Sequence, residues 1–173
     1  MCCIYSVNTF DRMNHRERFG RFVDVVLKHE GGYVWDKDDR GGETNFGITR
    51  YRYPDLDIKN LTIEEARDIY YRDFYQRMKL HYIKDDKLAL HVFDMGVNAG
   101  RTRAIELLQS LLKGCKIDGS LGPSTGQCIA LADTTTNLVE AYKAKRVEYY
   151  YKVSLRGNNS KFLKGWVNRV NNT

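Results

Sequence analysis

The residues best suited to chemistry lie in one short stretch, Glu-Gly-Gly-Tyr at 30–33, and in the acidic, glycine-rich loop that follows it. A single carboxylate, Glu30, stands at the end of a segment with helical apolar spacing, and the loop adds Asp36 and Asp39. Cleavage of a glycosidic bond needs one carboxylic acid that protonates the leaving oxygen and commonly a second carboxylate nearby. The stretch therefore suits general-acid chemistry on a sugar chain, with Glu30 as the acid.

A helix must position Glu30. Apolar residues at helical spacing form one stripe: Phe19, Phe22, Val23, Val26 and Leu27. Asn14 followed by Glu17 predicts a capping box that begins this helix, and the glycines at 31–32 predict its end. Glu30 would then project from the last turn near the apolar interior, where burial keeps a carboxyl protonated near neutral pH. Periodicity alone equally allows a solvated glutamate beside a turn.

The motif at 30–33, followed by Gly-Gly-x-Thr-Asn-Phe-Gly-Ile-Thr at 41–49, resembles the signature of the glycoside hydrolase 108 family of bacterial and phage N-acetylmuramidases. Further blocks follow in the family's order: Leu61-Thr62, Glu65-Ala66, Ile69-Tyr70, Phe93-Asp94, Val97-Asn98 and Gly100. The segments 118–125 and 165–170 resemble the predicted peptidoglycan-binding region that usually accompanies the family. The resemblance extends over about residues 16 to 171.

This resemblance implies a mainly α (α+β), lysozyme-like helical fold with a small β-ribbon or loop after the first helix. It implies an enzyme that cleaves the β-1,4 bond between N-acetylmuramic acid and N-acetylglucosamine without a cofactor or metal. Glu30 would protonate the leaving oxygen. Asp39 or Asp36 would stabilise the oxocarbenium ion, position water or act as nucleophile. A carboxyl separation of about 5 Å would imply retention, and ~6.5–9.5 Å inversion.

Other candidate site residues follow by analogy. Phage-type lysozymes place an Asp and a Thr after the catalytic Glu at similar distances, which makes Thr44 the third catalytic candidate beside Glu30 and Asp39. The alternative interpretations are that Asp39 is an exposed acid of the loop and that Thr44 is a structural threonine of the ribbon. The candidate substrate-binding residues are Tyr33, Asp36, Asn45 and Asn98.

Several neighbouring residues have structural interpretations. Asp94 and Asn98 share a helix face; we expect Asp94 to tie helices together, whereas Asn98 could reach sugar hydroxyls. Tyr33 and Trp35 could stack on sugar rings, and we interpret Glu43 as structural and Trp166 as a core residue.

Start and stop signals predict the remaining elements. Helices are expected from Thr49 to Pro54, Thr62 to Phe74, Asp85 or Asp86 to Gly100, Thr102 to Gly114, Pro123 to Leu131, Thr136 to 153, and 161 to 170. Strand-like pieces at 33–35 and 45–48 predict a two- or three-stranded ribbon. We expect an N-terminal extension at 1–15, a catalytic region at 16–113 and a helical peptidoglycan-binding region at 114–173. The short connection predicts that the last region packs on the catalytic one.

Charge and composition narrow the partners. The net charge is +6, which favours polyanions, and bacterial cell wall is one of them. Basic residues are interspersed with acids and no nucleic-acid motif is present, so we expect peptidoglycan glycan strands and not nucleic acid. No apolar run approaches the ~18 residues of a membrane span, so no stable membrane insertion is expected. We expect a monomer.

The sequence gives little support for a zinc site or for a disulfide. Cys2 and Cys3 have no matching pair for a zinc site, and Tyr33 stands where a zinc protease motif needs its second His. Cys115 and Cys128 are interpreted as free thiols, with one bridge as the alternative.

The start of the chain bears on localisation. No basic-then-apolar leader precedes residue 16, so we expect cytoplasmic synthesis without a signal peptide and release to the wall by a holin or secretion system. Phage and prophage endolysins have that arrangement. An alternative function is a non-catalytic wall-binding or secretion-accessory protein, such as a secretion activator, with the same fold. A third is a basic nucleic-acid-binding module.

Overall fold

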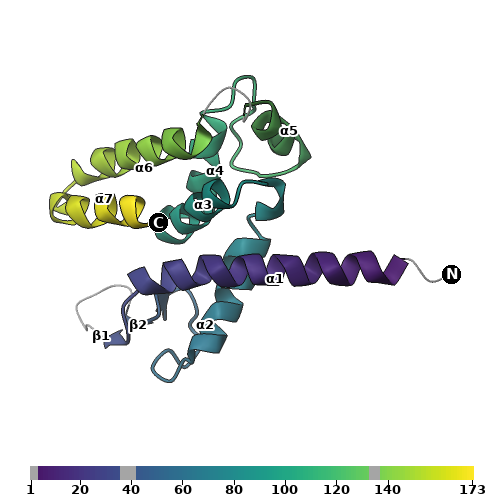
Figure 1. Ribbon diagram of the computed structural model, residues 1–173. Helices are drawn as coiled ribbons and strands as arrows, with labels where there is room; N and C mark the ends of the chain where they lie inside the picture. The colour runs from purple at the N-terminus through teal and green to yellow at the C-terminus, as the bar shows by residue number, and fades with distance from the viewer. Residues whose placement is uncertain (1–3, 36–41, 133–136) are drawn as a thin grey trace. The chain divides into compact units, whose positions relative to one another are not determined.

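The structure, a computed structural model, describes residues 4–35, 42–132 and 137–173. In chain order the elements are α1 (Ile4–His29), β1 (Val34–Trp35), β2 (Glu43–Asn45), β3 (Ile48–Thr49), α2 (Ile63–Tyr70), the π-helical η1 (Tyr71–Gln76), the 3-10 helix η2 (Leu80–Tyr82), α3 (Asp86–Ala99), α4 (Arg101–Gln109), α5 (Pro123–Ala132), α6 (Leu138–Ser154), the 3-10 helix η3 (Asn159–Phe162) and α7 (Leu163–Asn172) (Figure 1). The expected mainly α fold with a small β element is confirmed.

Packing divides the chain into two compact units, Met1–Asp73 and Phe74–Thr173. The boundary between them falls within η1. The assignment of functional regions to 1–15, 16–113 and 114–173 stays a prediction.

The first unit is built on α1. Phe19, Phe22, Val23 and Val26 are buried, so the apolar stripe of α1 is covered as expected. The predicted helix start at Asn14 was wrong, because α1 already begins at Ile4. No proline or glycine interrupts residues 4–13, and a helix that has nucleated propagates through such a segment regardless of a local capping pattern.

A three-stranded antiparallel ribbon follows α1, in the order β1-β2-β3. Figure 1 shows it next to the C-terminal end of α1. Val34 pairs with Thr44, and Asn45 pairs with Ile48. Phe46 and Gly47 form the two-residue turn between β2 and β3, with φ of 49° and 73°. Two positive φ values in a two-residue hairpin loop are the mark of a type I′ turn, whose twist matches that of the strands.

The segment after β3 is a turn rather than the expected short helix. The N–H groups of Arg52 and Tyr53 both donate to the carbonyl oxygen of Thr49, at 3.1 Å each, and no helix continues from there. Pro54 disfavours helical backbone at the residue before it, so the segment stops after a single turn. The capping box of α2 is confirmed: Glu65 N–H donates to Thr62 Oγ1 at 3.3 Å, and Thr62 N–H donates to the Glu65 carboxylate at 2.8 Å.

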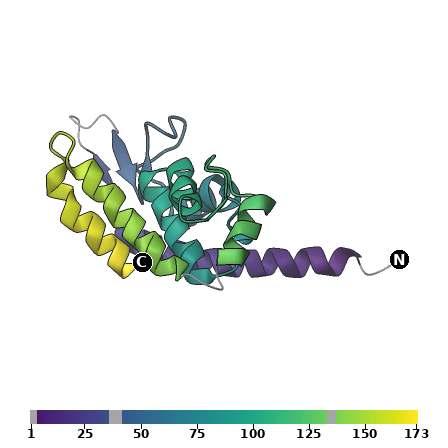
Figure 2. The same cartoon turned by 90° about the horizontal axis from the view of Figure 1, so that it is seen from above.

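In the second unit α3 packs against α4 and α6, and α6 packs against α7. Figure 2 shows α6 and α7 side by side. Asp85 caps α3 by accepting from Leu88 N–H at 2.7 Å, as predicted, and α5 begins at Pro123 as predicted. The prediction that Thr102 caps α4 was wrong, and the predicted cap Thr136 cannot be compared with the structure. Gly100 precedes α4, so Thr102 is already inside the first turn, and Thr136 lies outside the described residues.

A buried ion-pair network joins α3 to α6 and α7. Asp94 is fully buried and accepts from the guanidinium groups of Arg146 and Arg169, the latter from Nε at 2.9 Å. Burial alone would raise the pKa of the Asp94 carboxyl, but Arg169 and Arg146 hold it below its ordinary value. The expectation that Asp94 ties helices together is confirmed.

Candidate active site

Glu30 follows directly after α1 and is half-buried. Its N–H donates to the Val26 carbonyl oxygen at 3.2 Å, so the residue still belongs to the last hydrogen-bonded turn. The helix end therefore fixes the backbone from which the Glu30 side chain projects.

The Glu30 carboxyl rests against the backbone of Gly47. A Cβ placed on Gly47 would lie 2.5 Å from Glu30 Oε2 and 2.9 Å from Glu30 Cδ. Carbon and oxygen cannot approach so closely without displacement, so only glycine leaves room for the carboxyl at this position. The hairpin turn between β2 and β3 thus forms one wall of the Glu30 site.

Tyr70 forms a second part of the same site. The same Cβ position on Gly47 would lie 2.7 Å from the Tyr70 hydroxyl oxygen. The Tyr70 hydroxyl and the Glu30 carboxyl are therefore both adjacent to the Gly47 Cα. Tyr70 is buried at the end of α2, and its O–H donates to the Phe46 carbonyl oxygen at 2.9 Å. The hydrogen bond holds the turn in place. A positive φ is unfavourable for a bulky residue such as Phe46, so the turn depends on contacts of this kind.

Asn45 holds the ribbon against the loop before α2. It is buried, and its side-chain amide donates to the carbonyl oxygens of Ile58 at 3.1 Å and Leu61 at 3.4 Å. Two carbonyl groups of the loop before α2 are thereby satisfied, and β2 is attached to that loop. Thr44 lies beside Asn45 on β2, is half-buried, and pairs with Val34 and Thr49.

Tyr33, Glu43 and Arg50 form a polar cluster on the ribbon. The Tyr33 hydroxyl donates to Glu43 Oε1 at 2.8 Å, and Arg50 Nε donates to Glu43 Oε2 at 2.7 Å. Arg50 first and Tyr33 second hold the pKa of the Glu43 carboxyl below its ordinary value. Glu43 is therefore an ionised, fully engaged carboxylate that braces the ribbon, in agreement with its structural interpretation.

Strand β1 presents an exposed apolar surface. Val34 is 59% exposed and Trp35 60% exposed, on the strand that follows Glu30 and its two glycines. An exposed aromatic ring beside an exposed valine can contact the apolar faces of sugar rings.

The remaining site candidates are Asp36, Asp39 and Asn98. Asp36 and Asp39 lie outside the described residues. Asn98 belongs to the second unit, where it is exposed at the end of α3 and its Oδ1 accepts from the Tyr150 hydroxyl at 3.0 Å. Trp166 stacks on Tyr150 with ring centroids 5.3 Å apart and is half-buried.

Two further residues of the Glu30 site, Gly47 and Tyr70, had not been proposed from the sequence. Gly47 carried a local signal, since a glycine between the strand-like pieces at 45 and 48 is typical of a tight hairpin. Tyr70 belongs to one block of the family resemblance, but no local pattern linked it to the turn, because its partner Phe46 lies 24 residues away.

What this group can do chemically follows from its geometry. A half-buried carboxyl held between a helix end, a glycine turn and a tyrosine hydroxyl has a fixed position, and the exposed strand β1 follows it in the chain. In the described residues no group of His, Cys, Asp and Glu is arranged to hold a metal ion. Across the same residues no helix is long and apolar enough to cross a membrane. Cys115 and Cys128 are free thiols, both half-buried.

Comparisons with known proteins agree with the sequence motifs. Residues 23–100 match the family model Glycosyl hydrolase 108, and residues 103–171 match the model Predicted Peptidoglycan domain. Among solved structures, the chain is similar to that of Brucella abortus SagA, with a TM-score of 0.73 and 25% sequence identity over 90% of this chain and 91% of that chain. A comparison with curated proteins finds no match. The family resemblance inferred from the motifs at 30–33 and 41–49 is confirmed.

Proposed function

Residues 23–100 form a glycosyl hydrolase 108 domain, and from that premise we propose that the protein is an N-acetylmuramidase with Glu30 as its general acid. A glycosyl hydrolase domain followed by a peptidoglycan domain makes the chain a peptidoglycan hydrolase of the lysozyme-like kind. We propose further that the bond cleaved is the β-1,4 linkage between N-acetylmuramic acid and N-acetylglucosamine, and we propose which residues cleave it.

One observation carries the proposal for Glu30: its carboxyl is seated against Gly47, within the family's glycine-rich motif. A general acid must be held where the leaving oxygen will lie, and misplacement by about 1 Å can cost roughly 10²-fold in rate. A solvated glutamate beside a turn would have no such seat. The half-buried position supports the function of proton donor over that of a surface charge.

The second catalytic group is proposed from the loop that follows β1. Asp39 or Asp36 would stabilise the oxocarbenium ion, position water or act as nucleophile, and Thr44 on β2 would assist by holding water. Tyr33 and Trp35 would contact the sugar rings from the ribbon, since both are exposed there. Asn45 would act by positioning the ribbon through its bonds to Ile58 and Leu61.

The setting of the activity is also proposed. The enzyme would act as a monomer on glycan strands, without nucleic acid as a partner, after release to the wall by a holin or a secretion system. An endolysin or a prophage-encoded secretion activator would have this route.

The test is Glu30→Gln, which keeps the size of the side chain but removes the transferable proton. General-acid catalysis contributes ~10²–10⁴-fold, so the loss of reducing ends released from purified peptidoglycan should be at least that large. The matched control is Glu64→Gln, an exposed glutamate of the same unit in the first turn of α2, which should keep full activity. Both variants should melt at the wild-type temperature.

Mass spectrometry of the products identifies the bond, because a muramidase leaves N-acetylmuramic acid at the new reducing end. Retained activity in Glu30→Gln would remove Glu30 from the mechanism. A wild-type protein that binds peptidoglycan but releases no reducing ends would favour the non-catalytic wall-binding alternative.

A second series addresses the loop acids. Asp39→Asn should lower activity far more than Asp38→Asn, with Asp36→Asn in between. Equal and mild effects of the three changes would leave water held by Thr44, or a group elsewhere, as the second catalytic component.

A further inference from the structure

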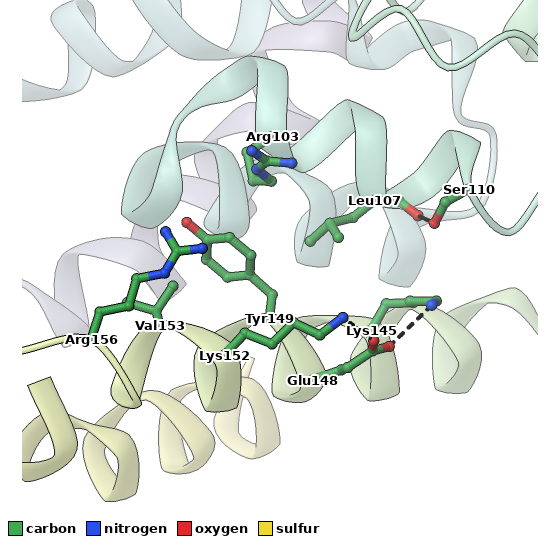
Figure 3. A pocket seen from close by; sticks show the side chains of 9 residues that line it. All are labelled: Arg103, Leu107, Ser110, Lys145, Glu148, Tyr149, Lys152, Val153 and Arg156. Carbon is green, nitrogen blue, oxygen red and sulfur yellow. Dashed lines mark hydrogen bonds and ion pairs between the residues drawn. The ribbon is translucent and has the colours of Figure 1, made fainter.

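Helices α4 and α6 of the second unit flank an open pocket of about 270 Å³. From α4 and the residue directly after it come Arg103, Leu107 and Ser110. From α6 come Lys145, Glu148, Tyr149, Lys152 and Val153, and Arg156 follows two residues after the end of that helix (Figure 3). Glu30 and its seat belong to the other unit, so this pocket contains none of the proposed catalytic residues.

The pocket carries a strong excess of positive charge. Four basic side chains line it, against the single carboxylate of Glu148. Glu148 accepts from Lys145 Nζ at 3.0 Å and from Lys152 Nζ at 2.6 Å, and these two ammonium groups hold the pKa of Glu148 down to about 2. The carboxylate therefore stays ionised, aligns both lysines and leaves the pocket with a net positive charge.

Two of the four basic side chains are arginines, Arg103 and Arg156. Arg103 pairs with Glu106, which does not line the pocket, at 2.9 Å, and its guanidinium lies 5.8 Å from the centre of the Tyr149 ring. Within the part of the chain that the structure describes, Arg156 has an exposed side chain and no ion pair. A planar guanidinium with free donors is well suited to a carboxylate, which it can bind with two parallel hydrogen bonds.

The floor between these charges is apolar. Leu107, Tyr149 and Val153 are each half-buried and line the pocket from both helices. A cationic rim over an apolar floor fits a ligand that combines carboxylates with small aliphatic groups. The volume is below the roughly 300–1,000 Å³ of pockets that enclose a drug-sized ligand, so it suits the end of a short peptide.

We propose that this pocket binds the carboxylate end of the stem peptides of peptidoglycan. This inference extends the proposed function. It depends on that function in one respect, namely that peptidoglycan is the substrate. In intact glycan the muramic acid carboxyl is consumed in the amide bond to the peptide, so the sugars are uncharged and the remaining carboxylates lie on the stem. Alanine methyl groups at the end of the stem match the apolar floor. Such a contact would select peptide-bearing strands over bare ones.

The test measures binding of the free stem tetrapeptide to the full-length chain by calorimetry or by NMR titration. Exposed ion pairs are individually weak, so we expect a dissociation constant in the submillimolar to millimolar range that rises several-fold between low and moderate salt. Lys152→Gln with Arg156→Gln should weaken binding at least about tenfold. The matched control, Lys161→Gln with Lys164→Gln, makes the same change in charge outside the pocket and should leave binding unchanged.

Glu148→Gln gives a readout in the opposite direction. It removes the only carboxylate of the pocket and releases two lysines, so the affinity for the tetrapeptide should rise about threefold. A merely structural role of Glu148 predicts no gain. A tetrapeptide with amidated carboxyl groups should fail to bind the wild-type chain.

Several results would overturn the proposal: equal weakening by both double variants, binding that ignores salt, or tighter binding of a glycerol-phosphate oligomer than of the tetrapeptide. The last would assign the pocket to wall phosphates instead. Because the tetrapeptide contains no glycosidic bond, its binding does not depend on Glu30, and failure here leaves the muramidase proposal intact.

Discussion

The Glu30 carboxyl occupies the space that a side chain on Gly47 would fill, with Oε2 at 2.5 Å from the position of that Cβ. The end of α1 and the turn between β2 and β3 are thus matched to each other through a residue that has no side chain. This relation makes the turn part of the proposed acid site, although the turn contributes no reactive group.

Gly47→Ala should therefore displace the Glu30 carboxyl. We expect a loss of peptidoglycan hydrolase activity of about 10²-fold, since displacement of a catalytic group by ~1 Å has that effect. The left-handed φ of 73° adds a destabilisation of roughly 1–2 kcal/mol, measured by urea unfolding. The control is Gly42→Ala, which has a similar φ of 66° but whose Cβ would meet nothing closer than Arg50 Cβ at 4.0 Å. Equal losses of activity in both variants would attribute the effect to backbone strain alone.

Tyr70→Phe should reduce activity through the turn rather than through the proton. It leaves the Phe46 carbonyl without its donor, at a cost of about 1 kcal/mol, and loosens the wall on which Glu30 rests. We expect activity to fall at least about tenfold. Tyr53→Phe removes a hydrogen bond of 2.8 Å to the Asp73 carboxylate in the same unit, so it should cost at least as much stability with activity nearly unchanged. If both variants kept full activity, the Tyr70 hydroxyl would have no part in the site.

His91 should make the protein less stable in mild acid. Its Nδ1 lies 2.9 Å from Arg146 Nη1, and burial, followed by the Arg146 charge, lowers the pKa of His91 to about 4. The unfolded chain, with an ordinary histidine pKa near ~6.5, binds the proton first. This contribution to stability is complete above about pH 6.5 and falls as the pH drops toward 4, by at most about 1.4 kcal/mol per pH unit.

Urea unfolding at several pH values between 4 and 7.5 checks this expectation. His91→Asn, which keeps an acceptor for Arg146, should flatten the pH dependence in that window. His81→Asn changes an exposed histidine and should leave the wild-type profile. A wild-type free energy of unfolding that is constant from pH 7 to 4.5 would contradict the neutral, buried state of His91.

Truncation after Lys113 should give an unfolded or aggregating fragment. It removes α6 and α7, and with them Arg146 and Arg169, and so leaves the carboxylate of Asp94 without its partners. Breaking a buried pair in this way costs about 3–5 kcal/mol, and the apolar face of α3 would be exposed as well. Circular dichroism and thermal melting of residues 1–113 test this. A sharp transition with intact activity on short oligosaccharides would establish a separable catalytic domain.

The sequence alone determined those features whose partners lie within a few residues. The Thr62–Glu65 capping box, the Asp85 cap, Pro123 at the start of α5 and the glycines after Glu30 all depend on local backbone geometry. The apolar stripe of α1 was equally readable, because helical spacing fixes which side chains share a face. The family motif identified Glu30 and its neighbourhood for the same reason, as a contiguous pattern.

Tertiary structure decided which distant residues meet. Asp94 binds Arg146 across 52 residues and Arg169 across 75, and Glu30 meets Gly47 only because the ribbon folds back onto the end of α1. The start of α1 and the turn after Thr49 also departed from their local signals. Spacing along a chain fixes neighbours within one element, whereas the approach of two elements depends on the packing of everything between them. The seat of Glu30 and the cationic pocket between α4 and α6 are therefore properties of the folded chain.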